Sequence, residues 1–268
     1  MNKYLKKLPA LVDSHAHLDF KNFNRDRDAV IQRAVDYGLK LVVNVGFNMP
    51  SSREAVALAE KYPLVYAAVG VHPHDAANVP DNYLAEMQEM ARHPKVVAFG
   101  EMGLDYYRDR SPRWQQWAVF SQQLRLAREV NLPVVIHSRD AHPETLALLE
   151  EEGLPAAGGV MHCFSGDLAL AEKVIAMGLY VSIAGPVTYP RNHALKQVAA
   201  SIPEEWLLVE TDAPFLPPGP WRGKRNEPAY TTFIVEKIAE LRGTTAEKIG
   251  QACLENARRL FSRVRVED

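Results

Sequence analysis

The chain has 268 residues, of which 47% are apolar, and a net charge of −2. A chain of this length can bury the core of one domain, and we expect residues 1–268 to form a single domain. Because basic residues are not in excess, the composition argues against a protein that binds long nucleic acid through many phosphate contacts. A small local basic patch stays compatible with this charge.

The start of the sequence lacks the pattern of a secretory or membrane-spanning segment. The apolar stretch that follows MNKYLKK ends at Asp13, which is too short for a signal-peptide core and far too short to span a bilayer. The sequence has two cysteines, Cys163 and Cys253, and no CxxC pair, so neither a disulfide framework nor a thiolate zinc site is expected. We therefore expect a cytoplasmic protein with no membrane association and no obligate protein partner.

Short apolar runs rich in β-branched residues alternate with helical stretches along the chain. These runs are too apolar for surface strands, which favours a parallel sheet covered by helices. The runs predicted as strands are, in chain order, Leu11–His17, Leu39–Gly46, Val65–His74, Val96–Leu104, Leu132–Arg139, Gly159–Phe164, Leu179–Gly185 and Leu207–Asp212.

Helices are predicted where an apolar stripe lies between a start signal and a stop signal. Ser111 is expected to cap one helix, with Pro112 at its first position, and Asp167 is expected to cap another. Thr244 and Glu247 have the spacing of a capping box for the last helix. In chain order, the helices defined in this way are Arg25–Tyr37, Pro112–Val130, Leu168–Met177 and a final helix ending near Phe261.

Eight repeats of strand and helix predict an α/β protein with the (β/α)8 TIM-barrel fold. The alternative that the same pattern allows is an open, doubly wound sheet. In either fold the carboxyl ends of parallel strands carry the functional site, and in a barrel they form its C-terminal mouth.

Nearly every predicted strand ends in side chains that can bind metal. Residues i and i+2 of a strand point to the same side, so His15 and His17 are expected to project together. Any single histidine of this kind could instead be a hydrogen-bonded core residue, but many strand ends together favour a metal site. Imidazole and carboxylate groups suit zinc, manganese or a similar divalent ion. The residues at these ends are His15, His17, His72, His74, Glu101, Asp105, His137, His162, Glu210 and Asp212.

Other candidate ligands have simpler interpretations. Cys163 directly follows His162, so on a strand it would point away from the site and serve as a core thiol. One member of the alternating pair His72 and His74 could serve the structure alone. The histidines expected to be solvated lie in helix or loop stretches: His93, His142 and His193.

Sequence segments from the first predicted strand to the last helix are similar to those of one family. They are VDSHAHLDF, VGVHPHDA, GEMGLDYYRD, PVVIHSRDA, MHCFSGD, GPVTYPRN, ETDAPFLPP, RGKRNEP and ENARRLF. The chain thereby resembles the TatD family of metal-dependent deoxyribonucleases, within the amidohydrolase-like barrels. One departure is Met102, where many members have a small or β-branched residue; it flanks Glu101 and removes no ligand.

The resemblance implies a catalytic centre with two divalent ions, which could be zinc, magnesium or manganese. His15, His17 and Asp212 would bind one ion, and Glu101 would bridge it to a second ion. The resemblance assigns the second ion to His137 and His162. His74, Asp105 and Glu210 would support the ligands or face the substrate.

This implied ligand set agrees with the chemistry of two-metal hydrolysis. A bridging carboxylate such as Glu101 offsets the repulsion between two dications about 3.5–4 Å apart. A metal ion lowers the pKa of water to about 7, which provides a nucleophile. Asp212 could accept that proton and pass it to the leaving group, so Asp212 and Glu101 are the predicted catalytic residues.

Basic and aromatic residues in the loops after the strands predict a phosphodiester substrate. Arginine forks match phosphate oxygens, and aromatic rings stack bases, although solvated charges and rim packing are the simpler alternatives. Arg139 and Tyr106 are the substrate-facing residues that we select. The full set is Arg108, Arg110, Arg139, Arg191, Arg222, Lys224, Arg225, Tyr106, Tyr107, Tyr189, Phe215 and Trp221.

The sequence therefore predicts a deoxyribonuclease that cleaves phosphodiester bonds in DNA from an end or in a short single strand. One alternative is a related barrel that hydrolyses an amide, ester or lactone. Many such enzymes bridge their metals with a carboxylated lysine at the fourth strand end, where this chain has Glu101, while Lys95 lies at the opposite end of that strand. The other alternative is a metal-stabilised binding protein without catalytic activity.

Overall fold

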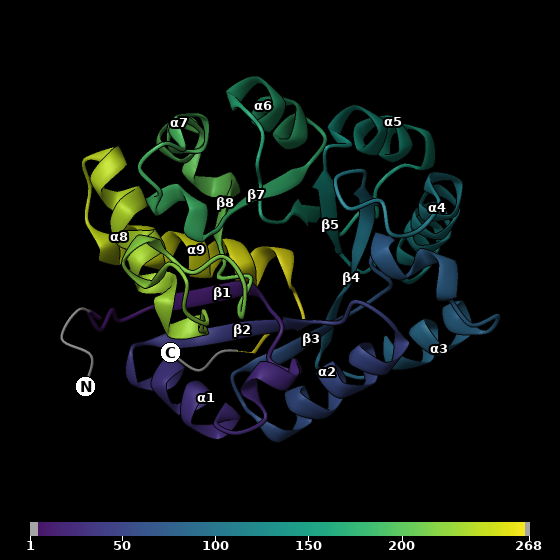
Figure 1. The fold of residues 1–268 in the computed structure, drawn as a ribbon, viewed down its shortest axis with the longest axis horizontal. Helices are drawn as coiled ribbons and strands as arrows, with labels where there is room; N and C mark the ends of the chain where they lie inside the picture. Colours follow the sequence, from purple (N-terminus) through teal and green to yellow (C-terminus); the bar gives the residue numbers. More distant parts are fainter. Residues whose placement is uncertain (1–4, 266–268) are drawn as a thin grey trace. The chain divides into compact units, whose positions relative to one another are not determined.

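The computed structural model describes residues 5–265, and its strands and helices alternate along the chain (Figure 1). The strands are β1 (Leu11–Ala16), β2 (Leu39–Val45), β3 (Val65–Val69), β4 (Val96–Asp105), β5 (Val134–Arg139), β6 (Gly159–Met161), β7 (Leu179–Ile183) and β8 (Leu207–Val209). The helices are α1 (Arg27–Asp36), α2 (Met49–Lys61), α3 (Tyr83–Met90), α4 (Arg113–Val130), α5 (His142–Glu152), α6 (Leu168–Ala176), α7 (His193–Ser201), α8 (Thr231–Arg242) and α9 (Ala246–Leu260).

The strand order identifies the fold. The eight strands follow one another in the sheet in their sequence order, β1 to β8. A doubly wound sheet instead changes direction from its middle and has a non-sequential order. The (β/α)8 barrel prediction is therefore confirmed, and the open-sheet alternative is wrong.

The chain divides into two compact units, and each is described by itself. In the first unit (residues 5–44 and 163–259), β7 pairs with β8 and β1 pairs with β2, both in parallel. An isolated parallel bridge also joins Ala16 to Ala213, just beyond β8. In the second unit (residues 45–162 and 260–265), β3, β4, β5 and β6 pair in parallel in that order. The single-domain prediction for residues 1–268 stays a prediction.

The strands are buried along most of their length because their apolar side chains pack on both faces of the sheet. All ten residues of β4 are buried, including Glu101 and Asp105. Burying such carboxyl groups is unfavourable unless hydrogen bonds or charges compensate them. The polar residues of the strand ends therefore have to be paired with one another or with a ligand.

Three strands, β3, β6 and β8, end three to five residues earlier than the sequence pattern suggested. β3 ends at Val69, and it could not have continued to His74 because Pro73 lacks an N–H group and opens the 3-10 helix η2 (Pro73–Asn78). His72 is the N-cap residue of η2, and its Nδ1 accepts a hydrogen bond from the His74 backbone N–H at 3.0 Å. β6 ends at Met161 rather than at Phe164, and Cys163 has φ of 45°. This left-handed conformation cannot continue a strand.

The helix-cap predictions were partly wrong. Asp167 caps α6 as predicted, through its side chain and the Leu170 N–H. Pro112, not Ser111, is the N-cap residue of α4, while the Ser111 hydroxyl donates to the His74 carbonyl at 2.9 Å. The last helix begins one residue later than expected, and the Thr245 hydroxyl accepts the Lys248 N–H at its start.

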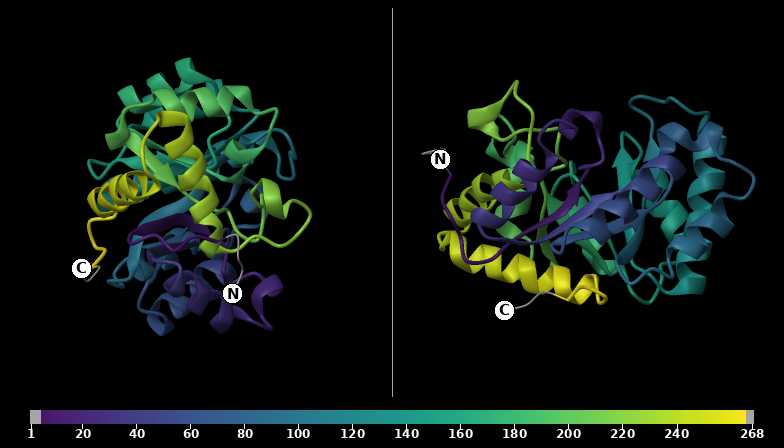
Figure 2. Two further views of the ribbon diagram at one scale, coloured as in Figure 1. Left: turned by 90° about the vertical axis from the view of Figure 1, so that its left-hand side faces the viewer. Right: turned by 90° about the horizontal axis from the view of Figure 1, so that it is seen from below.

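Within the first unit, the long loop between β8 and α8 packs against the segment that follows β1. Figure 2 shows this yellow-green loop next to the purple N-terminal part of the chain. Arg225 of the loop binds both carboxylate oxygens of Asp26 at 2.7 Å and the carbonyl of Asn22. These contacts hold the loop next to the end of β1.

Candidate metal sites

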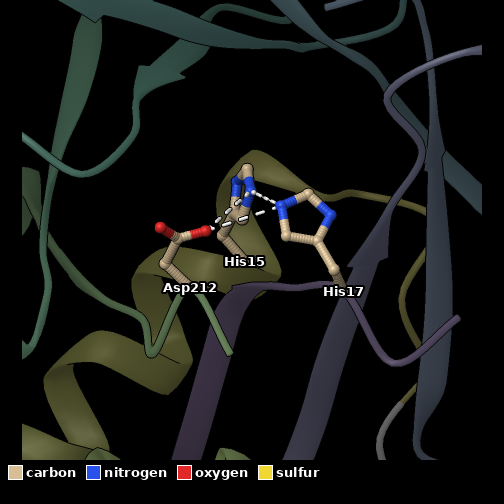
Figure 3. A group of neighbouring side chains, drawn as sticks. All are labelled: His15, His17 and Asp212. Atoms are coloured by element: carbon tan, nitrogen blue, oxygen red, sulfur yellow. Dashed lines mark hydrogen bonds and ion pairs between the residues drawn. The ribbon is translucent and has the colours of Figure 1, made fainter. Parts of the chain in front are cut away.

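In the first unit, two histidines and an aspartate converge just beyond the ends of β1 and β8 (Figure 3). The Nε2 atoms of His15 and His17 lie 3.2 Å apart. The Asp212 Oδ1 atom lies 3.8 Å from His15 Nε2 and 3.5 Å from His17 Nε2. Both histidines are buried, and the Asp212 side chain is 14% exposed. The structure thus brings together the three residues that were assigned to one ion.

Backbone contacts between β1 and the segment after β8 hold these side chains in place. The Asp212 N–H donates to the His15 carbonyl at 2.9 Å, and the His17 N–H donates to the Ala213 carbonyl at 2.7 Å. Asp212 has φ of 55°, an uncommon backbone conformation for a residue other than glycine. Such conformations are concentrated at functional sites, where the surroundings hold them in place.

Asp13, a fully buried residue two positions before His15, was not among the site residues predicted from the sequence. Its carboxyl oxygens accept hydrogen bonds from the N–H and the hydroxyl of Thr211, and from the His15 N–H. Burial raises the pKa of Asp13 to about 8, although these hydrogen bonds oppose the rise. Asp13 therefore ties the backbone beside Asp212 to that of His15. Its position inside the VDSHAH segment was the signal that could have revealed it.

The geometry of this cluster fits a small divalent ion. A tetrahedral ion with bonds of about 2.0–2.2 Å separates its ligand atoms by about 3.3–3.6 Å. The three separations of 3.2, 3.5 and 3.8 Å are close to that range. Two imidazoles and one carboxylate also leave a coordination position for water or substrate, as in catalytic zinc sites.

In the second unit, a carboxylate and two histidines converge at the ends of β4, β5 and β6. The Glu101 Oε2 atom lies 2.7 Å from His162 Nε2 and 3.5 Å from His137 Nδ1. The two histidine nitrogens are 3.1 Å apart. Glu101 and His162 are buried, and the His137 side chain is 15% exposed. These are the two histidines that were assigned to the second ion, together with Glu101, the predicted bridge.

The Asp105 carboxylate contacts two histidine rings, one of which is the His137 ring of this cluster. Its Oδ2 atom lies 3.0 Å from His137 Nε2 and 3.0 Å from His74 Nε2. When a metal ion is bound, a proton on Nε2 shared with Asp105 would leave the Nδ1 lone pair of His137 free to coordinate it. Carboxylates that orient ligand histidines in this way are typical of metal sites.

Hydrogen bonds keep the Asp105 carboxyl group charged because they lower its pKa. Burial alone would raise the pKa of Asp105, but hydrogen bonds from His137, His74 and the Arg108 N–H together lower it. Burial likewise opposes a charged His137, yet its hydrogen bonds to Asp105 and Glu101 raise its pKa. Asp105 is therefore a charged residue that fixes two histidine rings.

His72 is a further candidate ligand, one of the two alternating histidines of which the sequence left one as structural. It is buried, and one of its ring nitrogens lies within 4.8 Å of ligand atoms of Glu101 and His137. Burial lowers the pKa of His72 well below its ordinary value, so the ring is neutral and able to coordinate.

Three expectations for individual residues need correction or refinement. Cys163 is partly exposed rather than a core thiol, because β6 ends before it, and its N–H donates to Glu210 Oε1 at 2.7 Å. Glu210 thus supports the chain after β6 from a fully buried position. His142 and His93 were expected to be solvated but are half-buried, with His142 Nδ1 2.9 Å from the Ser138 hydroxyl and His93 Nε2 3.1 Å from Glu60 Oε1. His193 is exposed as expected.

The two predicted substrate-facing residues, Tyr106 and Arg139, differ in their contacts and in their exposure to solvent. The Tyr106 hydroxyl accepts the Trp117 ring N–H at 2.8 Å, and the Arg113 guanidinium lies 4.0 Å from the Tyr106 ring centre. Arg139 is exposed and lies 3.9 Å from the ring centre of Tyr107, which is 55% exposed. Tyr106 is therefore engaged in packing, whereas Arg139 and its aromatic neighbour face solvent.

Comparison with known proteins decides the family. The sequence model of the family described as TatD related DNase matches residues 12–262, which is almost the whole chain. The chain belongs to the TatD family. The resemblance seen in the sequence is thereby confirmed, and a metal-dependent hydrolase with the (β/α)8 fold follows from it.

The individual relatives agree with this assignment. The uncharacterized metal-dependent hydrolase YabD of Bacillus subtilis (strain 168) is 47% identical over 94% of this chain and 98% of its own length. The 3'-5' ssDNA/RNA exonuclease TatD of Pectobacterium atrosepticum is 40% identical over 94% of this chain and 99% of its own. The crystal structure of YjjV, a TatD homologue from Escherichia coli K12, matches with a TM-score of 0.89, 37% identity and coverage of 94% and 98%.

This TatD-family chain contains no helix in residues 5–265 that is long and apolar enough to cross a membrane.

Proposed function

We propose that this TatD-family hydrolase is a deoxyribonuclease that uses two divalent ions to hydrolyse phosphodiester bonds at the end of a DNA strand. The observation that carries the proposal is the pair of histidine–carboxylate clusters at the carboxyl ends of the strands, one in each unit. A relative 40% identical to this chain is named a 3'-5' ssDNA/RNA exonuclease, which supports a nucleic acid substrate. The ions would be zinc, magnesium or manganese, all of which accept these ligands.

Each ligand has a defined role in this proposal. His15, His17 and Asp212 would hold one ion, and His137 and His162 would hold the other with Glu101. Such ions would supply Lewis acidity at a phosphoryl oxygen and acidify a water molecule. The bridging role of Glu101 stays a prediction.

Asp212 is the proposed proton acceptor. Its Oδ1 atom faces both histidines, while its second carboxylate oxygen points away from them (Figure 3). That second oxygen would take the proton that the attacking water loses and pass it to the leaving alkoxide. Proton transfer by a positioned carboxylate of this kind typically contributes about 10²–10⁴-fold to the rate.

An exposed aromatic side chain beside the first cluster supports a nucleobase as part of the substrate. Phe215 is 44% exposed, and its ring lies 6.1 Å from the His17 ring and 5.2 Å from the Phe20 ring. Its N–H donates to the Asp212 carbonyl at 2.8 Å, which fixes it next to a proposed ligand. Aromatic residues in such positions stack bases with little sequence preference.

The alternative reaction, hydrolysis of an amide, ester or lactone, has less support. The Lys95 amino group donates to the carbonyls of Pro63 at 2.6 Å and Val65 at 3.2 Å, near the start of β3. It therefore points to the amino ends of the strands and is not available as a carboxylated bridge. A non-catalytic binding protein would not need a ligand set that leaves an open coordination position.

Metal analysis and a strand-cleavage assay on the same preparation test the proposal. We expect two divalent ions per gently purified chain, and shortening of end-labelled single-stranded DNA that stops on chelation and resumes when metal returns. The same assay on duplex DNA and on RNA of equal sequence measures which nucleic acid the enzyme prefers as substrate. Full activity after exhaustive chelation, with no metal detected, would contradict the two-ion centre. Metal-loaded protein that cleaves lactones or amides but no phosphodiester would contradict the nuclease assignment.

A further inference from the structure

A pocket of about 650 Å³ lies in the first unit, outside the ligand cluster. The residues that line it come from the loop after β7 and the loop after β8: Tyr189, Pro190, Arg191, Asn192 and Arg222. Its volume is in the range of pockets that hold small ligands, about 300–1,000 Å³. Neither predicted metal site includes any of these residues.

Two exposed guanidinium groups give the pocket its charge. Within residues 5–265, neither Arg191 nor Arg222 forms an ion pair with a carboxylate. The same loop contains Arg225, which is held by Asp26 at 2.7 Å and so serves the fold. The Arg222 guanidinium lies 4.7 Å from the ring centre of Tyr189. Two unpaired guanidinium groups at one pocket favour an anion with several oxygens, and arginine forks fit phosphate.

Hydrogen bonds within the protein hold the walls of the pocket in place. The Tyr189 hydroxyl donates to the Pro217 carbonyl at 2.9 Å. The Thr188 hydroxyl accepts the Gly219 N–H at 2.7 Å and donates to the Gly185 carbonyl at 2.7 Å. A side chain at Gly185 would collide with the Leu216 carbonyl, since its Cβ would lie 2.1 Å away. The two loops therefore form a preorganised surface, which lowers the cost of binding.

The same loop connects the pocket to a proposed ligand. Residues 212–222 run without interruption from Asp212 past Phe215 to Arg222. The side-chain amide of Asn226 donates to the carbonyls of Thr211 and Phe215 at 2.8 and 2.7 Å, which fixes the first part of this path. A base stacked on Phe215 and a phosphate held by Arg222 would therefore both be bound by this one loop.

We infer that this pocket binds a phosphate group of the nucleic acid strand other than the one being cleaved, with Arg191 and Arg222 as its binding residues. The inference rests on the proposed nuclease function and adds a second contact point for the substrate. That phosphate is either an internal phosphodiester or the terminal monoester of the strand, since both present the same oxygens.

Binding to the full-length protein under chelation separates this contact from catalysis. The probe is a fluorescently labelled five-nucleotide oligothymidylate, with and without a 5′-phosphate, measured by anisotropy in the presence of a chelator. The variants are Arg191→Gln, Arg222→Gln and the double variant. Lys173→Gln is the matched control, since Lys173 is an exposed cation on α6 that does not line the pocket. Thermal unfolding verifies that each variant is folded.

The double variant should bind the strand at least about tenfold more weakly, because a charge-assisted contact to phosphate is lost. The slope of log K against log salt should become shallower by about 0.7, the value for one phosphate of a single strand. A loss with both probes identifies an internal phosphate, and a loss confined to the phosphorylated probe identifies the terminal one. Affinities equal to those of Lys173→Gln with both probes overturn the inference.

Binding and cleavage of the oligonucleotide by the metal-loaded wild-type protein test the proposed function separately. If it cleaves the oligonucleotide while the Arg variants bind as the control does, the pocket assignment alone is wrong. If the metal-loaded wild-type protein neither binds nor cleaves any oligonucleotide, the nuclease proposal is wrong and the pocket assignment is overturned with it.

Discussion

Among the candidate site residues, Glu101 is the one whose surroundings constrain it most. Its carboxylate is buried within β4 and lies within 3.5 Å of two histidine nitrogens. A buried carboxylate requires compensating charge, and histidines that coordinate a metal are neutral and provide little of it. A bound dication would provide that charge, so activity should depend on Glu101 more strongly than folding does.

The first prediction is that Glu101→Gln lowers turnover of DNA by at least about a hundredfold, since a metal contributes several kcal/mol to the transition state. The amide keeps the shape but not the charge of the carboxylate, so the melting temperature should change little. Steady-state kinetics, metal content and thermal unfolding test this together, with Glu60→Gln as the control because Glu60 is an exposed partner of His93. Near-normal turnover with two ions retained would show that Glu101 is not a bridging ligand.

The second prediction concerns the two thiols. Burial raises the pKa of Cys253 to about 12, whereas Cys163 is partly exposed. Because the thiolate is the reactive form, we expect one thiol per chain to react with a disulfide reagent at pH 8, and the second only after denaturation. Cys163→Ser should abolish the rapid phase. Equal reaction rates for both thiols in the folded protein would contradict the burial of Cys253.

At the scale of single residues, the strand-end rule was enough to select histidines and carboxylates that the structure brings together. Because side chains alternate along a strand, the sequence could place His15 and His17 on one side, and the structure has their Nε2 atoms 3.2 Å apart. Cys163 was misplaced because the rule assumes a continuing strand, whereas its backbone adopts φ of 45°. Asp13 was missed because its role depends on Thr211, which lies 198 positions away.

At the scale of elements, the loop between β8 and α8 is the segment on which the proposed function depends most. It carries Phe215 and Arg222, and its anchors lie far away in the sequence. Arg225 contacts Asp26 across 199 positions, and Glu227 contacts Arg33 across 194. Hydrophobic periodicity contains no information on such pairs, so the sequence could predict the loop but not which of its arginines are free.

The third prediction tests the Arg225 anchor. The hydrogen bond from Arg225 lowers the pKa of Asp26 below its ordinary value of 3.8, so its stabilising contribution is present above pH 3.8 and is lost as the pH falls below it. Arg225→Gln should cost about 0.5–1 kcal/mol at pH 7, a small value because the Asp26 and Arg225 side chains are 38% and 28% exposed.

Urea unfolding at pH 7 and at pH 3 measures the effect of this anchor. The difference between wild type and Arg225→Gln should shrink at the lower pH, which lies below the ordinary pKa of 3.8. Lys237→Gln removes an exposed pair with Glu240 on α8 and serves as the control, with an expected change below about 0.5 kcal/mol. A difference that is independent of pH would show that the contact with the Asn22 carbonyl, not the ion pair, holds the loop.

At the scale of the whole molecule, the fold was predictable because its signal repeats. Eight alternations of strand and helix leave few architectures, and the short β6 and β8 did not hide the pattern. Strand ends were predicted less well, since one proline after β3 or one left-handed residue after β6 moves a boundary by several positions. Net charge is also a whole-molecule property, and it limits the kind of contact that the protein can make with DNA.

The fourth prediction is that the protein contacts few phosphates and starts cleavage at a terminus. The chain carries a net charge of −2, and the exposed arginines proposed to contact phosphate, Arg139, Arg191 and Arg222, lie at strand ends or in the loops that follow the strands. A site of this kind neutralises few phosphates. The slope of log K against log salt is about −0.9 per phosphate on duplex DNA and about −0.7 on single strands, so it should be near −1 to −3 for this protein.

Circular and linear single-stranded DNA of equal sequence distinguish the two modes of attack. A base stacked on Phe215 and a phosphate held by Arg222 require a strand that can enter the loop region from a free end. The linear strand should therefore be shortened by one or a few nucleotides at a time, while the circle should resist cleavage under the same conditions. Rapid cutting of the circle, or a steep salt slope typical of many contacts, would favour an endonuclease with a wider binding surface.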